Sequence, residues 1–342
     1  MTRTDEPTFG LYYDFRHADE DAAGLTDRWR GIVEQIAWAE SVGFGSVWLS
    51  EHHFLGDDYA SSPMTLLAAI AMRTEHMQLG TNVLVLPVHH PLRLAEEALT
   101  VDALSAGRLR LGVGLGYRAP EFPPFGTSMQ ARRRRFESHF EVLRRAFRGE
   151  PVDGEGDSAI LVSPRAVRDG GPELWIGALS SPAIERAARL GDGFLCVLPD
   201  QMAEYVGVRR SLGLSDGQIA MGNQWIVADD PEREFARIGK HVLYQVNAYA
   251  EYGAFGPPES VPRLTDPQRI IDQGLYRLLD GATAANELAE QIGAGPVVDC
   301  FCWTLFPGEP LDSAAGRLEY FADHVIPSVR EAMAGARRFN RL

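Results

Sequence analysis

Short apolar runs alternate along the chain with amphipathic segments, and this alternation restricts the fold more than any other feature of the sequence. Most of the runs are continuously apolar, as expected for parallel strands that are covered on both faces. The segments between them carry apolar residues at helical spacing; Pro63 and Pro91 open two of these segments. Eight runs have this character: Phe9–Tyr13, Gly45–Leu49, Leu79–Leu86, Arg108–Val113, Leu174–Gly177, Phe194–Leu198, Ile219–Val227 and Val297–Trp303.

Eight repeats of strand and helix predict an α/β fold, and specifically a (β/α)8 TIM barrel. A doubly wound sheet is the alternative, because the number of strands does not by itself force closure. We expect one domain over residues 1–342, with a long insertion after strand 7 at Asp229–Pro296. The Gly253–Pro258 break in this insertion suits a mobile lid over the barrel mouth, and a surface excursion accounts for it equally well.

The charge balance excludes some classes of partner. Lys and Arg total 33 against 47 Asp and Glu, which gives a net charge of -14. This balance argues against nucleic acid and against an anionic membrane surface. Three cysteines without a Cys-x-x-Cys pair favour a reduced, cytoplasmic protein. We see neither a signal peptide nor an apolar run near the roughly 18 residues of a membrane span.

The strongest candidate for chemistry is the acid–imidazole cluster Glu51, His52 and His53, which follows the second apolar run directly. Side chains at the carboxyl end of a barrel strand face the usual active site of this fold. We expect His52 to face the cavity, with Glu51 and His53 behind it setting its tautomer. The alternative is that these are buried structural histidines that bind backbone carbonyls.

A metal site is a rival use of the histidines, because His89 and His90 supply a second pair after the third run. However, the chain has neither a His-x-His after the first run nor a His-Glu-x-x-His helix. We therefore expect no metal.

Two further segments suggest cofactor contacts. Gly112–Tyr117 has Gly-x-Gly-x-Gly spacing, but the prolines that follow do not open a helix, so a dinucleotide fingerprint is excluded. Glycines at a strand end let a flat ring approach the backbone.

Ser180 and Ser181, just before Pro182, could bind one phosphate at a helix N-terminus, although an ordinary serine N-cap is the commoner arrangement.

From Glu51 to Thr127 the chain resembles the bacterial luciferase-like flavin-dependent monooxygenases, the luciferase-like monooxygenase superfamily. The likeness extends without a gap over this stretch, and the Ser180–Gly191 segment, which includes Ala187-Ala188-Arg189-Leu190-Gly191, resembles the family's phosphate turn and helix. The matching residues are Glu51-His52-His53-Phe54, Gly80-Thr81, Val85-Leu86-Pro87, His90-Pro91, Arg93, Ala95-Glu96, Ser105, Gly107-Arg108 and Phe125-Gly126-Thr127.

The resemblance implies a monooxygenase that uses reduced FMN and dioxygen, through a flavin hydroperoxide, to oxidise a small organic substrate. His52 matches the essential histidine, and Asn82–Val83 match a flavin-stacking pair joined by a cis peptide. Because the chain has no nicotinamide fingerprint, we expect a separate flavin reductase to supply the reduced flavin. Family members often pair, so a homodimer is expected. The expected cofactor contacts are Asn82, Val83, Gly114, Leu115, Gly116, Tyr117, Ser180 and Ser181.

The chain departs from the family pattern at three positions. Gly114 stands where luciferase has a reactive cysteine, Leu115 replaces an arginine that helps to hold the flavin phosphate, and Ala183 replaces a phosphate-binding threonine.

Three other functions stay open. The first is hydride transfer with a deazaflavin coenzyme, as in a second branch of the superfamily. The others are those of a non-catalytic flavin-binding relative and of a metal-dependent barrel hydrolase.

Overall fold

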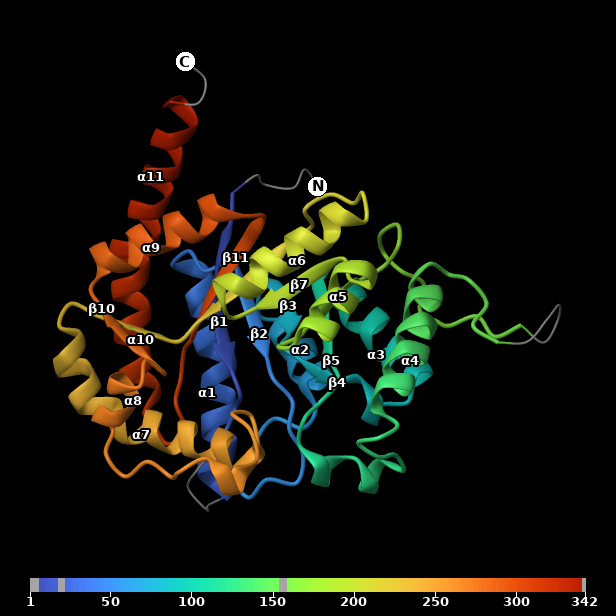
Figure 1. The fold of residues 1–342 in the computed structure, drawn as a ribbon, viewed down its shortest axis with the longest axis horizontal. Helices are drawn as coiled ribbons and strands as arrows, with labels where there is room; N and C mark the ends of the chain where they lie inside the picture. The colour runs from blue at the N-terminus through green and yellow to red at the C-terminus, as the bar shows by residue number, and fades with distance from the viewer. Residues whose placement is uncertain (1–5, 18–21, 154–158, 340–342) are drawn as a thin grey trace.

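The computed structural model describes residues 6–17, 22–153 and 159–339. Its centre is a closed barrel of parallel strands (Figure 1). The pairing of β3 with β5 closes the barrel, with Leu79 opposite Leu109. The TIM barrel predicted from the strand pattern is therefore confirmed. Its strands are β1 (Thr8–Tyr13), β2 (Ser46–Leu49), β3 (Gln78–Thr81) with its continuation β4 (Leu84–Val85), β5 (Leu109–Gly114), β6 (Glu173–Gly177), β7 (Gly193–Cys196), β8 (Ile219–Asn223) and β11 (Val297–Trp303).

Helices cover the outside of the barrel and bury one face each against it (Figure 1). In α3, for example, Pro91 starts the helix and Leu94, Ala98 and Leu99 face the core. The covering helices are α1 (Ala22–Ser41), α2 (Pro63–Ala71), α3 (Pro91–Leu104), α4 (Arg132–Phe147), α5 (Ser181–Leu190), α6 (Pro199–Ser211), α9 (Gly281–Ala294), α10 (Leu311–Tyr320) and α11 (Ile326–Phe339). Within the described ranges, none of the helices combines the length and apolar character needed to cross a membrane.

Two of the eight predicted runs are divided in the structure. Leu79–Leu86 separates into β3 and β4 at the Asn82–Val83 peptide bond, which is cis as the family resemblance implied. Ile219–Val227 separates into β8 and β9 (Trp225–Val227), and β9 leaves the barrel to pair with β10 (Arg277–Leu279). In both runs the break falls at polar residues, Thr81-Asn82 in the first and Asn223-Gln224 in the second, so neither run is apolar throughout.

Large side chains fill the barrel interior from its middle toward the amino ends of the strands. Trp48 and Trp175 are fully buried there, with ring centroids 5.8 Å apart. Below them the buried carboxylate of Asp299 accepts hydrogen bonds from the Ser46 hydroxyl (2.6 Å) and the Trp48 indole (2.7 Å). This end of the barrel is packed, so the carboxyl end is the one available for a site.

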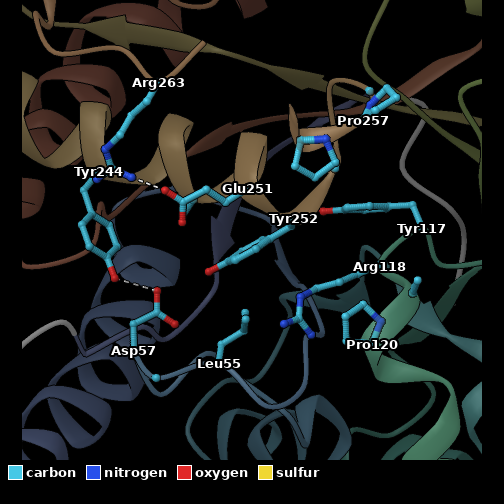
Figure 2. A pocket seen from close by; sticks show the side chains of 16 residues that line it. Leu55, Asp57, Tyr117, Arg118, Pro120, Tyr244, Glu251, Tyr252, Pro257 and Arg263 are labelled. Atoms are coloured by element: carbon cyan, nitrogen blue, oxygen red, sulfur yellow. Dashed lines mark hydrogen bonds and ion pairs between the residues drawn. The ribbon is translucent and has the colours of Figure 1, made fainter. Parts of the chain in front are cut away.

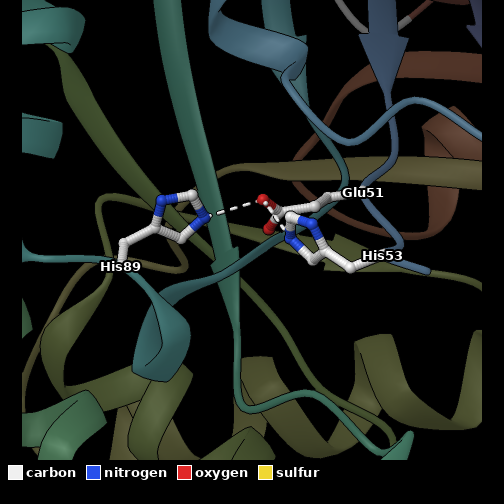
Figure 3. Close-up of side chains that lie close together, drawn as sticks. All are labelled: Glu51, His53 and His89. Atoms are coloured by element: carbon white, nitrogen blue, oxygen red, sulfur yellow. Dashed lines mark hydrogen bonds and ion pairs between the residues drawn. The ribbon is translucent and has the colours of Figure 1, made fainter. Parts of the chain in front are cut away.

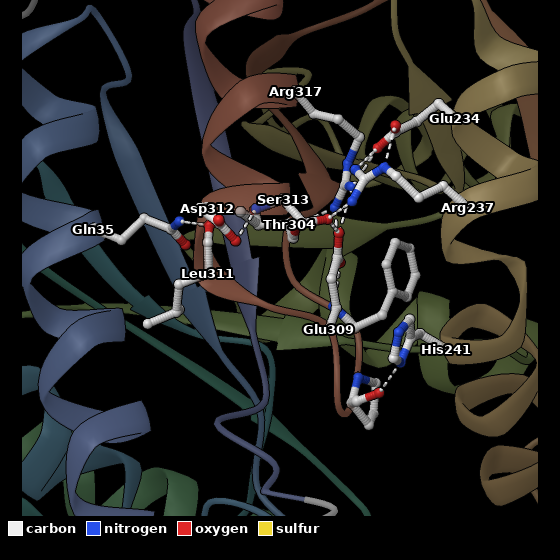
Figure 4. A network of polar contacts seen from close by, with 12 residues as sticks. Gln35, Glu234, Arg237, His241, Thr304, Glu309, Leu311, Asp312, Ser313 and Arg317 are labelled. Carbon is white, nitrogen blue, oxygen red and sulfur yellow. Dashed lines mark hydrogen bonds and ion pairs between the residues drawn. The ribbon is translucent and has the colours of Figure 1, made fainter. Parts of the chain in front are cut away.

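The insertion after the seventh barrel strand, β8, begins where it was predicted, but it ends earlier, because α9 lies within the predicted range and covers the barrel. It contains α7 (Pro231–Tyr252), a 3-10 turn at Pro258–Ser260, α8 (Gln268–Asp272) and β10. Arg317 of α10 fixes the first half of α7 through Glu234 (2.7 Å) and also binds Glu309, as Figure 4 shows. The last turn of α7 extends instead to the carboxyl end of the barrel, where it delivers Tyr252. A lid motion of this insertion stays a prediction.

Candidate active site

His52 is held at both ring nitrogens by residues that follow β5. Its Nδ1 lies 2.8 Å from Oε1 of Glu121, and its Nε2 lies 3.0 Å from the hydroxyl of Tyr117. The imidazole is 6% exposed and Glu121 is fully buried. Because β2 ends at Leu49, the turn that follows carries His52 directly over the carboxyl end of the barrel. His52 therefore lies at the barrel mouth as expected, but it does not face the cavity there, because Tyr117 lines that cavity and covers the imidazole.

The partners of His52 specify its tautomer. An ionised carboxylate only accepts hydrogen bonds, so Nδ1 carries the proton that is shared with Glu121. In the neutral ring Nε2 is then an acceptor, and the Tyr117 hydroxyl donates to it. Glu121 also accepts from the backbone N–H of His53 (2.9 Å), and Arg118 lies 3.7 Å from the same oxygen.

The expectation that Glu51 and His53 set the tautomer of His52 is wrong, because Glu121 makes that contact. Glu51 accepts instead from Nε2 of His53 (3.0 Å), Nε2 of His89 (2.7 Å) and the backbone N–H of Val85 (2.5 Å); Figure 3 draws the three side chains. Sequence reasoning missed Glu121 because it is 69 positions from His52, in a proline-rich loop without an assigned motif. The only signal was an acidic residue among apolar neighbours.

The ligand atoms of Glu51, His53 and His89 lie within 4.8 Å of one another, close enough to raise the question of a metal. Hydrogen bonding accounts for the cluster. Burial alone would raise the pKa of Glu51, but His89 and His53 outweigh burial and lower that pKa to about 2. Burial would lower the pKa of His89, but the Glu51 charge raises it overall. Glu51 therefore forms an ion pair with His89. Its contacts connect the turn after β2 to β4, through Val85, and to the turn before α3, through His89.

A cavity of about 760 Å³ opens beside Tyr117 (Figure 2). Three chain segments enclose it: the turn after β2, the loop after β5, and the second half of α7 with the segment that follows it. Its walls are largely aromatic rings, prolines and small residues, with four charged side chains at Asp57, Arg118, Glu251 and Arg263. Such a lining suits a small organic molecule with few polar groups. The remaining lining residues are Leu55, Gly56, Tyr117, Ala119, Pro120, Tyr244, Ala248, Tyr252, Gly253, Gly256, Pro257 and Pro258.

Tyrosine rings surround His52 on its other sides. The ring centroids of Tyr59, Tyr249 and Tyr252 lie 4.9, 6.1 and 5.4 Å from that of His52. Burial raises the pKa of each of these three phenols, so their hydroxyls stay protonated at neutral pH. Beneath them the fully buried Arg16 guanidinium lies 4.5 Å from the Tyr59 ring centroid. This wall keeps bulk water from the imidazole.

The predicted ring contacts Asn82 and Val83 lie at the same end of the barrel. The Asn82 carbonyl accepts from the Tyr12 hydroxyl (2.9 Å), and Val83 packs against the aromatic side chains inside the barrel. A Cβ at Gly114 would approach a Val83 methyl to 2.5 Å, and one at Gly177 would approach its other methyl to 2.6 Å. The structure thus gives these glycines a packing role around Val83. Their role in admitting a flat ring stays a prediction.

The predicted phosphate contacts follow β6. Ser180 precedes α5, but its side chain makes no capping hydrogen bond, so the ordinary serine N-cap is not what the structure has. Ser180 and Ser181 are both exposed, and Pro182 follows at the start of the helix. Leu115 and Gly116 follow β5, and Gly116 has a φ of 73°. Phosphate binding by this group stays a prediction.

A family model for luciferase-like monooxygenases matches residues 8–287. The chain belongs to this family. Limonene 1,2-monooxygenase from Rhodococcus erythropolis is 28% identical over 70% of the chain and 65% of that protein. The uncharacterized protein y4wF of Sinorhizobium fredii is 30% identical over 90% of the chain and 92% of that protein.

Solved structures of low sequence identity share the fold. Monooxygenase RslO1 from Streptomyces bottropensis has a TM-score of 0.78 at 23% identity, over 94% of this chain and 99% of that one. The oxygenating constituent of 3,6-diketocamphane monooxygenase from Pseudomonas putida, solved with FMN, has a TM-score of 0.74 at 16% identity, over 94% and 98% of the two chains. An F420-dependent secondary alcohol dehydrogenase has a TM-score of 0.68 at 18% identity, over 95% and 99%.

The match covers 65% of the length of the limonene enzyme, and the family model assigns the chain to its family. The residues at its barrel mouth can hold a proton on a buried, oriented imidazole and exclude water around it. Both properties suit general acid–base chemistry.

Proposed function

We propose that this luciferase-like monooxygenase uses reduced FMN and dioxygen to oxidise a small organic substrate in the cavity beside Tyr117. The observation that carries the proposal is the hydrogen-bonded chain from Glu121 through His52 to Tyr117, which ends at that cavity. A buried carboxylate–imidazole pair beside a cavity is suited to general acid–base catalysis.

The residues at the mouth fit a flavin. The Val83 side chain is partly exposed and lies between Gly114 of β5 and Gly177 of β6, so no larger side chain stands beside it at these two positions. Ser180 and Ser181, beyond the end of β6, are exposed hydroxyl donors for the phosphate. When bound, reduced FMN would supply the electrons that activate dioxygen. The complex of the related 3,6-diketocamphane enzyme with FMN supports this choice of cofactor.

The protein's part is to exclude water and to manage one proton. The rings of Tyr59, Tyr249 and Tyr252 separate His52 from bulk solvent, which would otherwise exchange protons with the imidazole during the reaction. His52 gives or takes a proton while the substrate is oxidised, and Glu121 holds the imidazole in the tautomer that this requires.

We further propose that a separate reductase supplies the reduced flavin and that the protein works as a homodimer. The missing nicotinamide fingerprint supports the first point. Purified protein with FMN and NADPH alone should therefore give no product, and addition of a flavin reductase should restore oxidation. Turnover without the reductase would contradict this part of the proposal.

Hydride transfer with a deazaflavin coenzyme is the second candidate. It is favoured by the fold shared with the F420-dependent alcohol dehydrogenase and by Leu115, which leaves the phosphate without the family's arginine. A flavin-binding protein without activity is the third candidate. The hydrogen-bonded pair of His52 and Glu121 argues against it.

One experiment separates these candidates. The protein is mixed anaerobically with photoreduced FMN and a panel of cyclic terpenes and ketones, and oxygenated buffer is then added. We expect an oxidised product that carries one atom of ¹⁸O from ¹⁸O2. Product formation with reduced F420 in the absence of dioxygen would favour the deazaflavin candidate. Tight flavin binding without any product would favour the non-catalytic one.

A further inference from the structure

The imidazole of His52 does not open directly onto the cavity. Its side chain is almost fully buried, and its Nε2 is covered by the Tyr117 hydroxyl at 3.0 Å. Tyr117, by contrast, is 36% exposed and lines the cavity. A substrate in the cavity therefore meets the phenol of Tyr117 before it can meet the imidazole.

The hydrogen bonds along this chain reverse when His52 changes its protonation state. With neutral His52, the Tyr117 O–H donates to Nε2, and the phenol oxygen turns its lone pairs to the cavity. With protonated His52, Nε2–H donates to the phenol oxygen, and the Tyr117 O–H is released toward the cavity. The phenol can thus lose one proton to the cavity while it gains another from the imidazole.

We propose that Tyr117 is a catalytic residue, the group that exchanges the proton with the substrate, while His52 acts through it and Glu121 is a positioning residue. The O–H bond of Tyr117 breaks toward the substrate oxygen as a new O–H bond forms with the proton from Nε2, so the phenol is unchanged and the imidazolium becomes neutral. The inference rests on the proposed function, and it assigns Tyr117 a role other than the cofactor contact expected from the sequence.

Tyr117 needs His52 behind it for this role. Burial, together with the charge on nearby Glu121, raises the pKa of its phenol, so Tyr117 alone is too weak an acid to release a proton at neutral pH. A concerted transfer from the imidazolium avoids a free phenolate. Tyr244 also lines the cavity, but its hydroxyl donates to Asp57 (3.1 Å). The contact with His52 is what distinguishes Tyr117.

The first test compares Tyr117→Phe with Tyr276→Phe. Tyr276 is a buried tyrosine away from the cavity whose hydroxyl binds Gln245 (2.8 Å), so its variant controls for loss of a buried phenol. We expect Tyr117→Phe to lower the rate of substrate oxidation about 100-fold, the lower end of the range for a general acid–base group. FMN affinity and thermal stability should stay near those of Tyr276→Phe, whose oxidation rate should stay near wild type.

A second variant covers the case in which Tyr117→Phe fails to fold. 3,5-Difluorotyrosine at position 117 keeps the ring and hydroxyl but makes the phenol more acidic. The pH profile of oxidation should then shift to lower pH, which a purely structural hydroxyl would not cause. A profile that superposes on that of wild type, or a Tyr117→Phe rate within threefold of wild type, would overturn the inference.

A third readout does not depend on turnover. In protein labelled with ¹⁵N-histidine, the Nε2 resonance of neutral His52 should be that of an unprotonated nitrogen that accepts a hydrogen bond, and Tyr117→Phe should shift it. An unshifted resonance would also overturn the inference. If wild type shows this pattern but never oxidises a substrate with reduced FMN, the proposed function fails while the hydrogen-bonded chain stands.

Discussion

The Nδ1 atom of His52 lies 2.8 Å from Oε1 of Glu121, although the two residues are 69 positions apart in the chain. The contact joins the turn after β2 to the loop after β5. It fixes both the orientation of the imidazole and the nitrogen that carries its proton. The chemistry of the barrel mouth therefore depends on how two loops pack against each other.

Removing the carboxylate of Glu121 should impair oxidation and spare flavin binding. We expect Glu121→Gln to lower the oxidation rate about 10- to 100-fold, since an amide can hold the ring in the wrong tautomer and cannot stabilise its charged form. The measurement is product formation with reduced FMN beside an FMN titration. Glu121→Asp keeps the charge and should retain more activity than Glu121→Gln. Equal rates for the two variants would speak against the assigned role.

Removing the imidazole itself should have a larger effect. We expect His52→Ala to abolish substrate oxidation and to leave the dissociation constant for FMN within about threefold of wild type, because the ring contacts expected for flavin come from other strands. FMN fluorescence measures binding and chromatography measures product. Oxidation at near the wild-type rate in His52→Ala would show that the imidazole has been assigned the wrong role.

The Glu51 cluster should stabilise the fold in a pH-dependent way. We expect Glu51→Gln to lower the free energy of unfolding at pH 6 by about 3 kcal/mol, as for other broken buried ion pairs. The folded pKa of Glu51, about 2, lies below its unfolded value of about 4.3. The contribution is therefore full above about pH 5 and is lost as pH falls toward 2.

Urea unfolding of wild type and Glu51→Gln at several pH values between 3 and 6 tests this prediction. The difference between the two proteins should shrink steadily as the pH falls. His89→Gln removes the partner instead and should reduce the same pH dependence. A difference that stays constant over this range would mean that the carboxylate of Glu51 is not held ionised by its histidine partners.

The replaced residue at position 115 leads to a prediction on cofactor affinity. Leu115 is where the family resemblance places a phosphate-binding arginine, so Leu115→Arg should tighten FMN binding about tenfold, the effect of one charge-assisted hydrogen bond. Riboflavin lacks the phosphate and is the matched control. Fluorescence titrations should show a change for FMN alone. An equal change in affinity for FMN and riboflavin would mean that the FMN phosphate does not lie near position 115.

The barrel could be predicted from the sequence because most of its strands are buried on both faces and appear as largely apolar runs. Phe9–Tyr13 and Val297–Trp303 are examples that became β1 and β11 with almost the same ends. β10 was missed because it has three residues, Arg277–Leu279, and pairs outside the barrel. So short a strand has no pattern of its own.

The candidate site could be predicted only in part for a similar reason. His52 was found because it follows a strand directly, and the end of a barrel strand is fixed by the fold. Glu121 and Tyr252 were missed because their places depend on the packing of loops and of the insertion. No local sequence pattern predicts how the loop after β5 and the insertion pack against the barrel mouth.

The most direct test is a crystal structure of the protein with FMN. The account predicts that the isoalloxazine ring lies over Val83 at the carboxyl end of the barrel, with one edge toward Tyr117 and His52 and the phosphate near Ser180. A flavin bound away from this end, or a His52 side chain turned into packed interior with no cavity between it and the ring, would contradict the account.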